Sequence, residues 1–583
     1  MKELKFLNKY FFKYRGRLLA GLAITVVATI FKIVVPAKIG DSVNAVKAYF
    51  DGSISKEMLQ SELMTDILFI VGAALLSGFF TFLMRQTIIV VSRYIEFDLK
   101  NEVFQQYERL SLSFYKQNRT GDLMNRISED VSKVRMYVGP ALMYGATTIT
   151  LFVVALTYMF MIAPVLTLYS IIPLPILSIS IYKLSVAIHK RSTVVQQYLS
   201  KLTTFAQESF SGISVIKAYG MEPKTNLKFE TLSNESKDKN IDLAKVQALF
   251  FPLMILLIGI SNIIVVYVGG NQFIEGKIEF GTIVEFLIYV NMLTWPVASV
   301  GFISSMVQQA EASQKRINEF LHEEPQIKNH ASHPTNIVGK IEFRDVSFVY
   351  PDTGIKALNK VSFSVHPGET LAIIGNTGSG KSTILELIGR LYDVTEGTYL
   401  VDDKPVQEVH LKSLRDATGY VPQDAFLFSD SIKNNIKFGK ADATDSEVIQ
   451  AAKDAAVHAN IEDFQKGYET VLGERGITLS GGQKQRVSIA RAIIKNPNIL
   501  LFDDCLSAVD TETEEAILNN LKKVSKNKTT LIVSHRVSSV KNADSILVLE
   551  DGRILQQGAH NELVNQEGYY KELYHKQLLE KEL

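Results

Sequence analysis

Cysteine is almost absent from this chain. Its 583 residues include a single cysteine, Cys505, which excludes a disulfide within the chain and any metal site built from several thiolates. A charge excess is also lacking, because 62 Lys and Arg residues stand against 61 Asp and Glu residues. Nucleic-acid-binding domains usually carry a clear basic excess. The composition therefore argues against a nucleic-acid-binding protein.

Apolar residues, in contrast, are abundant and unevenly placed. They make up 47% of the chain and are concentrated in its first half, in stretches that are each long enough to cross a bilayer as a helix. The predicted spans are about 18–38, 66–90, 139–162, 163–184, 248–269 and 281–305. We expect residues 1–322 to form an all-α transmembrane domain, the alternative being a soluble protein with six buried core helices.

The charges that flank the first span predict its orientation. Residues 1–17 contain six Lys or Arg, whereas residues 39–65 contain two Lys and four acidic residues. Lys and Arg are enriched on the cytoplasmic side of membrane proteins. We therefore expect the N-terminus in the cytoplasm and the protein in the cytoplasmic (inner) membrane. Six crossings return the chain to the same side.

Two long connections between the spans are expected on the cytoplasmic side. They run roughly 45 and 65 residues with a mostly unbroken helical pattern. Helices of that length, at about 1.5 Å per residue, would project roughly 30–40 Å from the membrane. Glycines interrupt the pattern in residues 118–124 and 211–222, where we expect the helices to turn.

A second domain is predicted after the membrane domain. Residues 323–340 are polar, contain two prolines and are typical of a linker. From 341 to 583, short β-rich runs alternate with helical ones, which indicates a parallel α/β domain.

A strand, a glycine loop and a helix follow one another in this second domain. The strand "TLAII" (370–374) leads into "GNTGSGKST" (375–383), which has the G-x-x-x-x-G-K-[ST] spacing of a phosphate-binding P-loop. Backbone N–H groups of such a loop face the phosphates of ATP, and the helix directs its positive end at them. The expected ATP-binding residues are Gly375, Asn376, Thr377, Gly378, Ser379, Gly380, Lys381, Ser382 and Thr383.

Three of the expected roles near the phosphates are specific. We expect Lys381 to reach the β- and γ-phosphates and Ser382 to bind Mg²⁺. Asp503, which ends the apolar strand "LLFD", is placed to hold the Mg²⁺ ion from the other side.

A further glycine turn, "LSGGQKQRVSIARAI" (479–493), opens a basic amphipathic helix. With this string the chain resembles the ABC transporter family, in particular exporters that fuse a six-span membrane domain to an ATP-binding domain. The resemblance covers nearly the whole chain. It implies an ATP hydrolase coupled to transmembrane transport, with ATP and Mg²⁺ as cofactors and a second half-transporter as partner.

The resemblance also implies roles for individual residues. Tyr350 is similar to the aromatic residue that stacks on adenine, Gln423 to the glutamine that contacts Mg²⁺ and the attacking water, and His535 to the histidine that meets the γ-phosphate. In a head-to-tail dimer, the signature residues would contact the ATP held by the partner. These are Ser480, Gly481, Gly482 and Gln483. Asp510 would lie in a loop at the dimer interface, and Glu474 and Arg475 in a loop that senses the membrane domain.

Asp504 departs from the common pattern. It occupies the position of the family's catalytic glutamate but is one methylene shorter, which moves the carboxylate back by about 1.5 Å. A displacement of about 1 Å can cost around a hundredfold in rate. Aspartate here resembles the weak site of heterodimeric, Mdl-like multidrug half-transporters. We therefore expect a heterodimer whose partner carries the glutamate, the alternative being a homodimer that uses Asp504 as a slower base.

The cargo is less well defined by the sequence. The spans favour hydrophobic or amphipathic small molecules, as in multidrug exporters. A homodimeric lipid flippase of the MsbA kind and an ATP-gated regulatory subunit are the alternatives. Lys32 and Glu285 lie toward the outer ends of the first and sixth spans, and we expect them to pair when the outer gate is closed, with snorkelling at the interface as the alternative. Cys505 is expected to be a buried residue at the end of a strand and not a nucleophile.

Overall fold

The computed structural model describes residues 2–473, 476, 479–507 and 511–582. Two compact units share the chain. The first, called the membrane unit below, comprises Met1–Tyr107 and Gly121–His322; the second, called the ATP unit, comprises Glu108–Thr120 and Glu323–Leu583. The short segment 108–120 thus groups with the ATP unit although it lies between two helices of the membrane unit.

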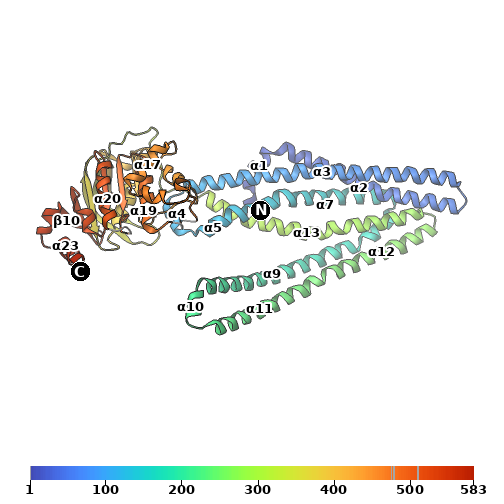
Figure 1. Ribbon diagram of the computed structural model, residues 1–583. Helices are drawn as coiled ribbons and strands as arrows, with labels where there is room; N and C mark the ends of the chain where they lie inside the picture. Colours follow the sequence, from blue (N-terminus) through green and yellow to red (C-terminus); the bar gives the residue numbers. More distant parts are fainter. Residues whose placement is uncertain (1, 474–475, 477–478, 508–510, 583) are drawn as a thin grey trace. The chain divides into compact units, whose positions relative to one another are not determined.

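Helices alone make up the membrane unit within the described residues (Figure 1). Its elements in chain order are η1 (Glu3–Leu7), α1 (Asn8–Lys13), α2 (Arg15–Phe50), α3 (Lys56–Arg109), α5 (Thr120–Asn125), η2 (Arg126–Asp130), α6 (Val131–Met136), η3 (Tyr137–Ala141), α7 (Leu142–Ile162), α8 (Pro164–Ile171), α9 (Pro173–Ser211), α10 (Ile213–Ala218), α11 (Glu222–Ala248), α12 (Phe250–Ile274) and α13 (Phe280–Leu321).

Six helical stretches in the described residues are long and apolar enough to cross a membrane. They are Arg15–Phe50, Lys56–Arg109, Thr120–Ile162, Pro164–Ser211, Glu222–Ile274 and Phe280–Leu321. Two helices of the fourth stretch start with proline: Pro164 and Pro173 occupy the first positions of α8 and α9, where a missing N–H costs no helical hydrogen bond. The number of membrane-spanning helices is as the sequence predicts.

Two turns of π-helix interrupt the third stretch, η2 before α6 and η3 after it. Such wide turns are rare and occur mostly as short insertions in α-helices. Pro140 lies within η3, and a proline in a helix interior removes one backbone hydrogen bond. At the other turn, Asp130 is buried and accepts hydrogen bonds from Ser313 and Arg316 of α13.

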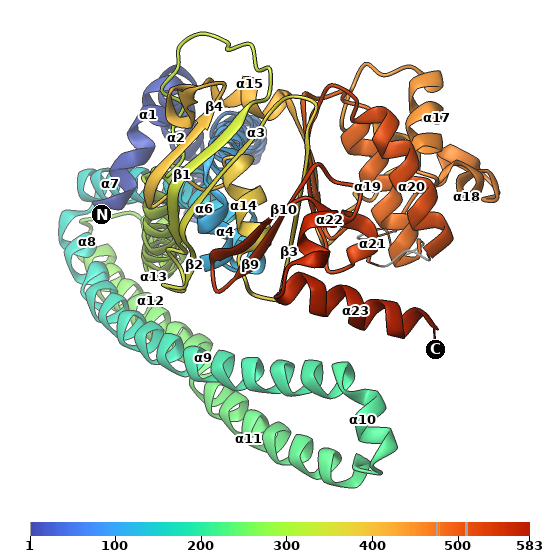
Figure 2. The same cartoon turned by 90° about the vertical axis from the view of Figure 1, so that its left-hand side faces the viewer.

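A long helical hairpin is formed by α9 and α11, with the short helix α10 between their ends (Figures 1 and 2). The helix α10 has no buried residue, and it falls within the segment 211–222 where the sequence predicts a turn. The other predicted turn, residues 118–124, begins directly after the short helix α4 (Leu112–Gln117) of the ATP unit and includes the start of α5.

The expected ion pair between Lys32 and Glu285 is not formed. Lys32 is exposed on α2, whereas Glu285 is buried on α13 beside Gly40 of α2. Among the described residues, no Lys or Arg lies within 4.0 Å of the Glu285 carboxylate, and its Oε1 has no hydrogen-bond partner. The two helices contact each other at Asn44 as well, whose side chain accepts a hydrogen bond of 2.6 Å from the Gly281 N–H.

The ATP unit contains two sheets. The strands are β1 (Ile341–Val349), β2 (Lys356–Val365), β3 (Thr370–Gly375), β4 (Glu396–Val401), β5 (Lys404–Pro405), β6 (Thr418–Val421), β7 (Ile499–Asp503), β8 (Thr529–Val533), β9 (Ser545–Glu550) and β10 (Arg553–Gly558). The first sheet is antiparallel with the order β2-β1-β4-β5; the second has the order β10-β9-β3-β8-β7-β6. In the second sheet β6, β7, β8, β3 and β9 run parallel.

Helices complete the ATP unit. Besides α4 they are α14 (Lys381–Ile388), η4 (Val406–Glu408), α15 (Leu411–Asp416), α16 (Ile432–Lys437), α17 (Asp445–Asp454), α18 (His458–Glu462), η5 (Gly467–Glu469), α19 (Gly481–Ile493), α20 (Thr511–Val524), α21 (Val537–Val540), α22 (His560–Asn565) and α23 (Tyr569–Glu582). Figure 2 shows α17 to α20 together on one side of this unit, away from β1 and β2.

The carboxyl ends of the parallel strands position the functional residues. Strands β3 and β7 are buried along almost their whole length, which agrees with their near-continuous apolar sequences. Both pair with β8, so β3 and β7 end at the same edge of the sheet. The predicted fold class, a six-helix membrane domain followed by an α/β P-loop domain, is confirmed.

Candidate nucleotide-binding site

The glycine loop runs from the end of β3 to the start of α14. Gly375 and Gly380 have φ values of 154° and 98°, in the region that favours glycine. At either position an added Cβ would collide with a backbone carbonyl oxygen, that of Leu549 beside Gly375 and that of Ala357 beside Gly380. Glycine is therefore required at both ends of the turn, which brings the chain into the N-terminus of α14.

Lys381 is the first residue of α14 and is buried. Its Nζ donates to the carbonyl oxygens of Gly375 and Asn376 at 2.9 and 2.8 Å. Burial lowers the pKa of this ammonium, and the nearby Asp504 and Asp503 oppose that shift. The side chain thus folds back over the loop, where its charge is available to an anion.

Ser382 and Asp503 lie side by side although they are far apart in the sequence. The Ser382 Oγ donates to Asp503 Oδ1 at 2.9 Å. Burial raises the pKa of the Asp503 carboxyl to about 6, an effect that the Ser382 hydrogen bond opposes and the neighbouring Asp504 reinforces. The two oxygen ligands that the sequence predicts for Mg²⁺ are therefore adjacent.

Asp504 follows β7 in a left-handed conformation, with φ of 41°. Its N–H donates to the Val533 carbonyl at 3.0 Å, and its own carbonyl accepts from Ser507 Oγ at 2.9 Å. Burial raises the pKa of the Asp504 carboxyl, while the charge of His535 opposes the shift. Burial and Lys381 together lower the pKa of His535, which favours a neutral imidazole beside the carboxylate.

These side chains share one pocket with a volume of about 310 Å³. Its lining joins residues of the glycine loop, the ends of β7 and β8, and the segment after β6. The lining residues are Tyr350, Ile355, Ala357, Thr377, Gly378, Gly380, Lys381, Ser382, Thr383, Gln423, Asp503, Asp504, Val533 and His535. The pocket therefore combines residues that the sequence assigned separately to adenine, phosphate, metal and water.

Tyr350 is one of the lining residues. Its hydroxyl donates to Glu386 at 2.8 Å and lies 2.8 Å from Thr383 Oγ1. The ring thus has a fixed orientation while one part of it borders the pocket. Glu386, which sequence reasoning did not identify, lies four residues after Ser382 on the same helix, a spacing that could have indicated a shared face.

The signature residues do not line the pocket. Ser480 precedes α19, and its Oγ accepts a hydrogen bond from the Gln483 N–H while Gln483 Oε1 accepts one from the Ser480 N–H. In this capping box, each of the two side chains binds the main-chain N–H of the other residue. Ser480 and Gly481 are exposed. Within one chain, the signature segment is thus separate from the pocket that contains the glycine loop. Asp510, Glu474 and Arg475 lie outside the described residues.

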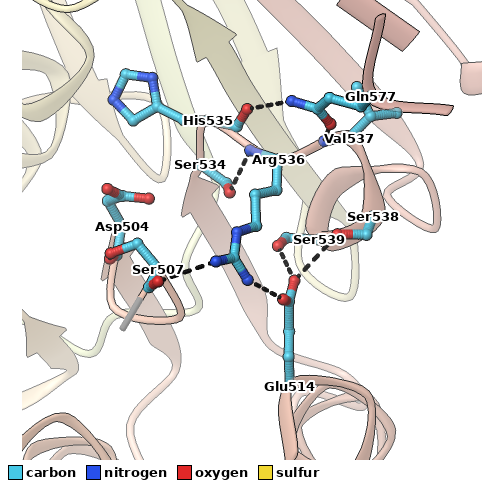
Figure 3. A network of polar contacts seen from close by, with 10 residues as sticks. All are labelled: Asp504, Ser507, Glu514, Ser534, His535, Arg536, Val537, Ser538, Ser539 and Gln577. Carbon is cyan, nitrogen blue, oxygen red and sulfur yellow. Dashed lines mark hydrogen bonds and ion pairs between the residues drawn. The ribbon is translucent and has the colours of Figure 1, made fainter. Parts of the chain in front are cut away.

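Behind His535 lies a polar network that no sequence motif indicated (Figure 3). The buried Glu514 carboxylate binds Arg536 at 2.8 Å and Ser538 at 3.2 Å. Arg536 also donates to the Ser507 carbonyl at 3.0 Å. The network therefore links the loop that carries His535 to the segment after Asp504. Cys505 is buried in an apolar cluster of the same region, and burial raises the pKa of its thiol.

The fold and this pocket define a P-loop nucleoside-triphosphatase domain attached to a six-helix membrane domain. Family models agree with both halves: "ABC transporter transmembrane region" matches residues 17–297, and "ABC transporter" matches residues 358–507. The chain belongs to the ABC transporter family. It is a multi-pass membrane protein that binds ATP and couples ATP hydrolysis to transport, and as a half-transporter it functions as a dimer.

Known relatives resemble the chain over nearly its whole length. A probable multidrug resistance ABC transporter ATP-binding/permease protein, YheI of Bacillus subtilis (strain 168), is 36% identical and covers 99% of this chain and 98% of its own. The multidrug resistance-like ATP-binding protein MdlA of Escherichia coli (strain K12) is 34% identical, with 98% and 96% covered. A solved structure of a bacterial Atm1-family ABC exporter with ATP bound has a TM-score of 0.82 at 27% identity, with 97% and 99% covered.

Proposed function

We propose that this chain is one half of a heterodimeric exporter and carries its weaker ATPase site. The carrying observation is Asp504, a buried carboxylate that lines the nucleotide pocket next to Asp503 and His535. A glutamate there would extend one methylene farther toward a bound phosphate. The shorter side chain supports slow cleavage, and a partner with a glutamate would then perform most of the turnover.

The proposed division of labour uses both halves of the chain's ATP unit. Lys381 and the loop N–H groups bind the phosphates, Tyr350 borders the adenine, and Asp504 orients the attacking water with His535 at the γ-phosphate. The signature residues Ser480 to Gln483, of which Ser480 and Gly481 are exposed, contact the ATP of the partner. Because the same ATP then binds donors from two chains, ATP binding stabilises the closed dimer and cleavage removes that stabilisation.

A Mg²⁺ ion fits the oxygen groups of this pocket. The Ser382 hydroxyl and the Asp503 carboxylate are 2.9 Å apart, and Gln423 lines the same pocket. Hard oxygen ligands with room for substrate phosphates are what Mg²⁺ prefers. We propose that these three side chains hold the ion, which would neutralise charge that develops on the phosphates.

The proposed cargo is a hydrophobic or amphipathic compound, exported from the cytoplasm or the inner leaflet. An apolar pocket of about 600 Å³ in the membrane unit supports this class; residues of α2, α3, η3, α7 and α13 contribute to it, including Leu22, Ile88, Gly145, Ile149 and Ile303. The basic residues before α2 support an N-terminus and an ATP unit in the cytoplasm, with the chain in the inner membrane.

ATP turnover by the purified chain alone in lipid nanodiscs tests the weak-site proposal. We expect the wild-type chain to be nearly idle and Asp504→Glu to increase turnover at least about tenfold, because the carboxylate is moved toward the water. Asp463→Glu, the same change at an exposed position, should have no effect. Brisk wild-type turnover that Asp504→Ala abolishes would mean that Asp504 is a competent base and would contradict the proposal.

The cargo class is tested separately. Hydrophobic and amphipathic compounds should stimulate ATPase activity of the chain assembled with its partner. If stimulation depends on one lipid class and is absent with small molecules, the lipid-flippase alternative holds. Nucleotide-dependent conformational change without any cleavage would instead favour a regulatory subunit.

A further inference from the structure

The C-terminal helix α23 contacts the loop that carries His535. The Gln577 side chain donates from Nε2 to the His535 carbonyl at 2.9 Å, and its Oε1 accepts from the Val537 N–H at 2.8 Å. Figure 3 shows the imidazole on one side of this loop and Gln577 on the other. One amide group therefore holds the main chain on both sides of Arg536.

These two hydrogen bonds satisfy main-chain groups that the loop cannot satisfy itself. Helix α21 has only four residues, and its N-cap residue Arg536 provides no side-chain cap. The first N–H groups of a helix lack acceptors within it, and Val537 is buried. Gln577 supplies the missing acceptor from a different helix, so the position of this short loop depends on α23.

Helix α23 is firmly anchored near its start. Tyr570 is fully buried, its hydroxyl lies 2.7 Å from His560 Nδ1, and its N–H donates to Gln556 Oε1 at 3.2 Å. It belongs to the apolar cluster that also contains Val537 and Ile374. The start of the helix therefore packs in the same apolar cluster as residues of β3 and α21.

The same helix also contacts the glycine loop. The Tyr569 hydroxyl donates to Asn376 Oδ1 at 3.0 Å. Tyr569 and Gln577 are eight residues apart, so their Cα atoms are separated by about 12 Å along the helix axis. One helix thus connects the phosphate-binding loop to the loop of the histidine proposed to meet the γ-phosphate.

The histidine loop is also held by α20. Arg536 binds the buried Glu514 of that helix and the Ser507 carbonyl. With α20 and α23 both bound to the loop, the main chain of His535 is fixed while its imidazole lines the nucleotide pocket. This arrangement is what a positioned catalytic group requires.

We propose that Gln577 of α23 is a positioning residue for His535 in ATP cleavage. This inference rests on the role proposed above for His535. It predicts that Gln577 affects the cleavage step and not ATP binding, because the phosphates bind to the glycine loop. Loss of its donor group should displace the His535 main chain without opening the apolar core.

The test is single-turnover cleavage of ATP by excess protein, together with the equilibrium affinity for ATP. Gln577→Glu keeps an acceptor for the Val537 N–H but faces the His535 carbonyl with a second oxygen. We expect cleavage to slow about tenfold, with ATP affinity changed less than about twofold. Lys576→Ala, an exposed neighbour on the same helix, is the matched control and should change neither quantity.

The same measurements are repeated in a His535→Ala background. All of them are made both with Asp504 and with Asp504→Glu, so that a slow site does not conceal the effect of Gln577→Glu on cleavage. If Gln577 acts through His535, Gln577→Glu should slow cleavage no further once the imidazole is gone. Equal slowing with and without His535, slowing by Lys576→Ala as well, or no slowing at all would overturn the inference.

The inference and the proposed function can fail separately. If His535→Ala slows cleavage but Gln577→Glu does not, only the positioning role of Gln577 is lost. If His535→Ala itself leaves cleavage unchanged, the proposed role of His535 fails and the inference fails with it.

Discussion

The ATP unit contains two glycine-rich segments that each open a helix, and they differ in what surrounds them. At the start of α14, Lys381, Asp503, Asp504 and His535 gather around one pocket. At the start of α19, Ser480 and Gln483 bond to each other, and Ser480 is exposed. Both helix starts favour anions, yet among the described residues only the first lies in a pocket together with the carboxylates and the histidine of its own chain. The second becomes useful when an anion is brought to it from outside.

The largest effect is expected when the charge of Lys381 is removed from the site at the start of α14. Lys381→Ala should lower ATP turnover by about a thousandfold, because a buried ammonium directed at the phosphates is lost. The carbonyls of Gly375 and Asn376, which now accept from Lys381, would also lose their donor. Steady-state turnover in nanodiscs measures the effect, with Lys381→Ala compared in the Asp504→Glu background so that a slow site does not conceal the loss. A loss under tenfold would mean that the phosphates do not bind at this loop.

A change in the signature segment at the start of α19 should affect ATP turnover without affecting ATP binding by the chain itself. Gly482→Asp places a carboxylate in the first turn of α19, where it suits the helix but repels a partner's phosphate. We expect about a hundredfold less turnover in the assembled dimer, with unchanged ATP affinity of the chain alone. If ATP affinity of the isolated chain also falls, the signature segment belongs to the chain's own pocket and the contrast between the two sites disappears.

Tyr350, the residue expected to stack on adenine, should have a smaller effect than Lys381 or Gly482. Tyr350→Ala removes a ring whose stacking on a base is worth roughly 1–3 kcal/mol, so ATP should bind about tenfold more weakly. Tyr350→Phe keeps the ring and loses the hydrogen bonds to Glu386 and Thr383; it should bind ATP within about twofold of wild type. Titration with ATP and with inorganic triphosphate checks the assignment, because only ATP binding should respond.

The smallest expected effect comes from pH. The pKa of Asp503 is raised to about 6, and protons compete with Mg²⁺ for this carboxylate. Affinity for ATP with Mg²⁺ should therefore fall about fourfold between pH 7 and pH 5.5. Asp503→Asn serves as the control for the titration of ATP itself, and an identical pH dependence in that variant would contradict the assignment.

The stability of the unliganded protein should depend on pH in the opposite direction to its affinity for ATP with Mg²⁺. Because the folded-state pKa of Asp503 lies above its ordinary value, the folded state binds this proton more readily than the unfolded state. The contribution of Asp503 to stability therefore improves as pH falls from about 6 toward 4.

Local motifs made most of the nucleotide pocket predictable. The glycine loop lies at the end of β3, Asp503 ends β7 and Asp504 follows it, and parallel strands of one sheet end at one edge. That geometry explains why residues more than a hundred positions apart meet. The separation of the signature residues from the pocket was likewise expected from the family resemblance.

Other features depend on tertiary contacts that no local pattern encodes. Gln577 lies on a helix near the end of the chain, and nothing in its neighbourhood of sequence relates it to His535. Glu514 has the appearance of an ordinary acidic residue near a helix start until its burial beside Arg536 is known. The π-helical turns around α6 and the failure of Lys32 and Glu285 to pair depend on how neighbouring helices pack.

The single buried thiol has a practical consequence for spectroscopy. Cys505 is the single cysteine of the chain and is enclosed in the apolar core. A maleimide or nitroxide reagent added to the folded protein therefore has no exposed native sulfhydryl to react with. Cysteines introduced on exposed residues of α10 and α4 would therefore take up spin labels or fluorophores selectively, without first removing a natural residue beside Asp504. Distance distributions recorded with and without ATP would then follow the transport cycle in an otherwise unaltered chain.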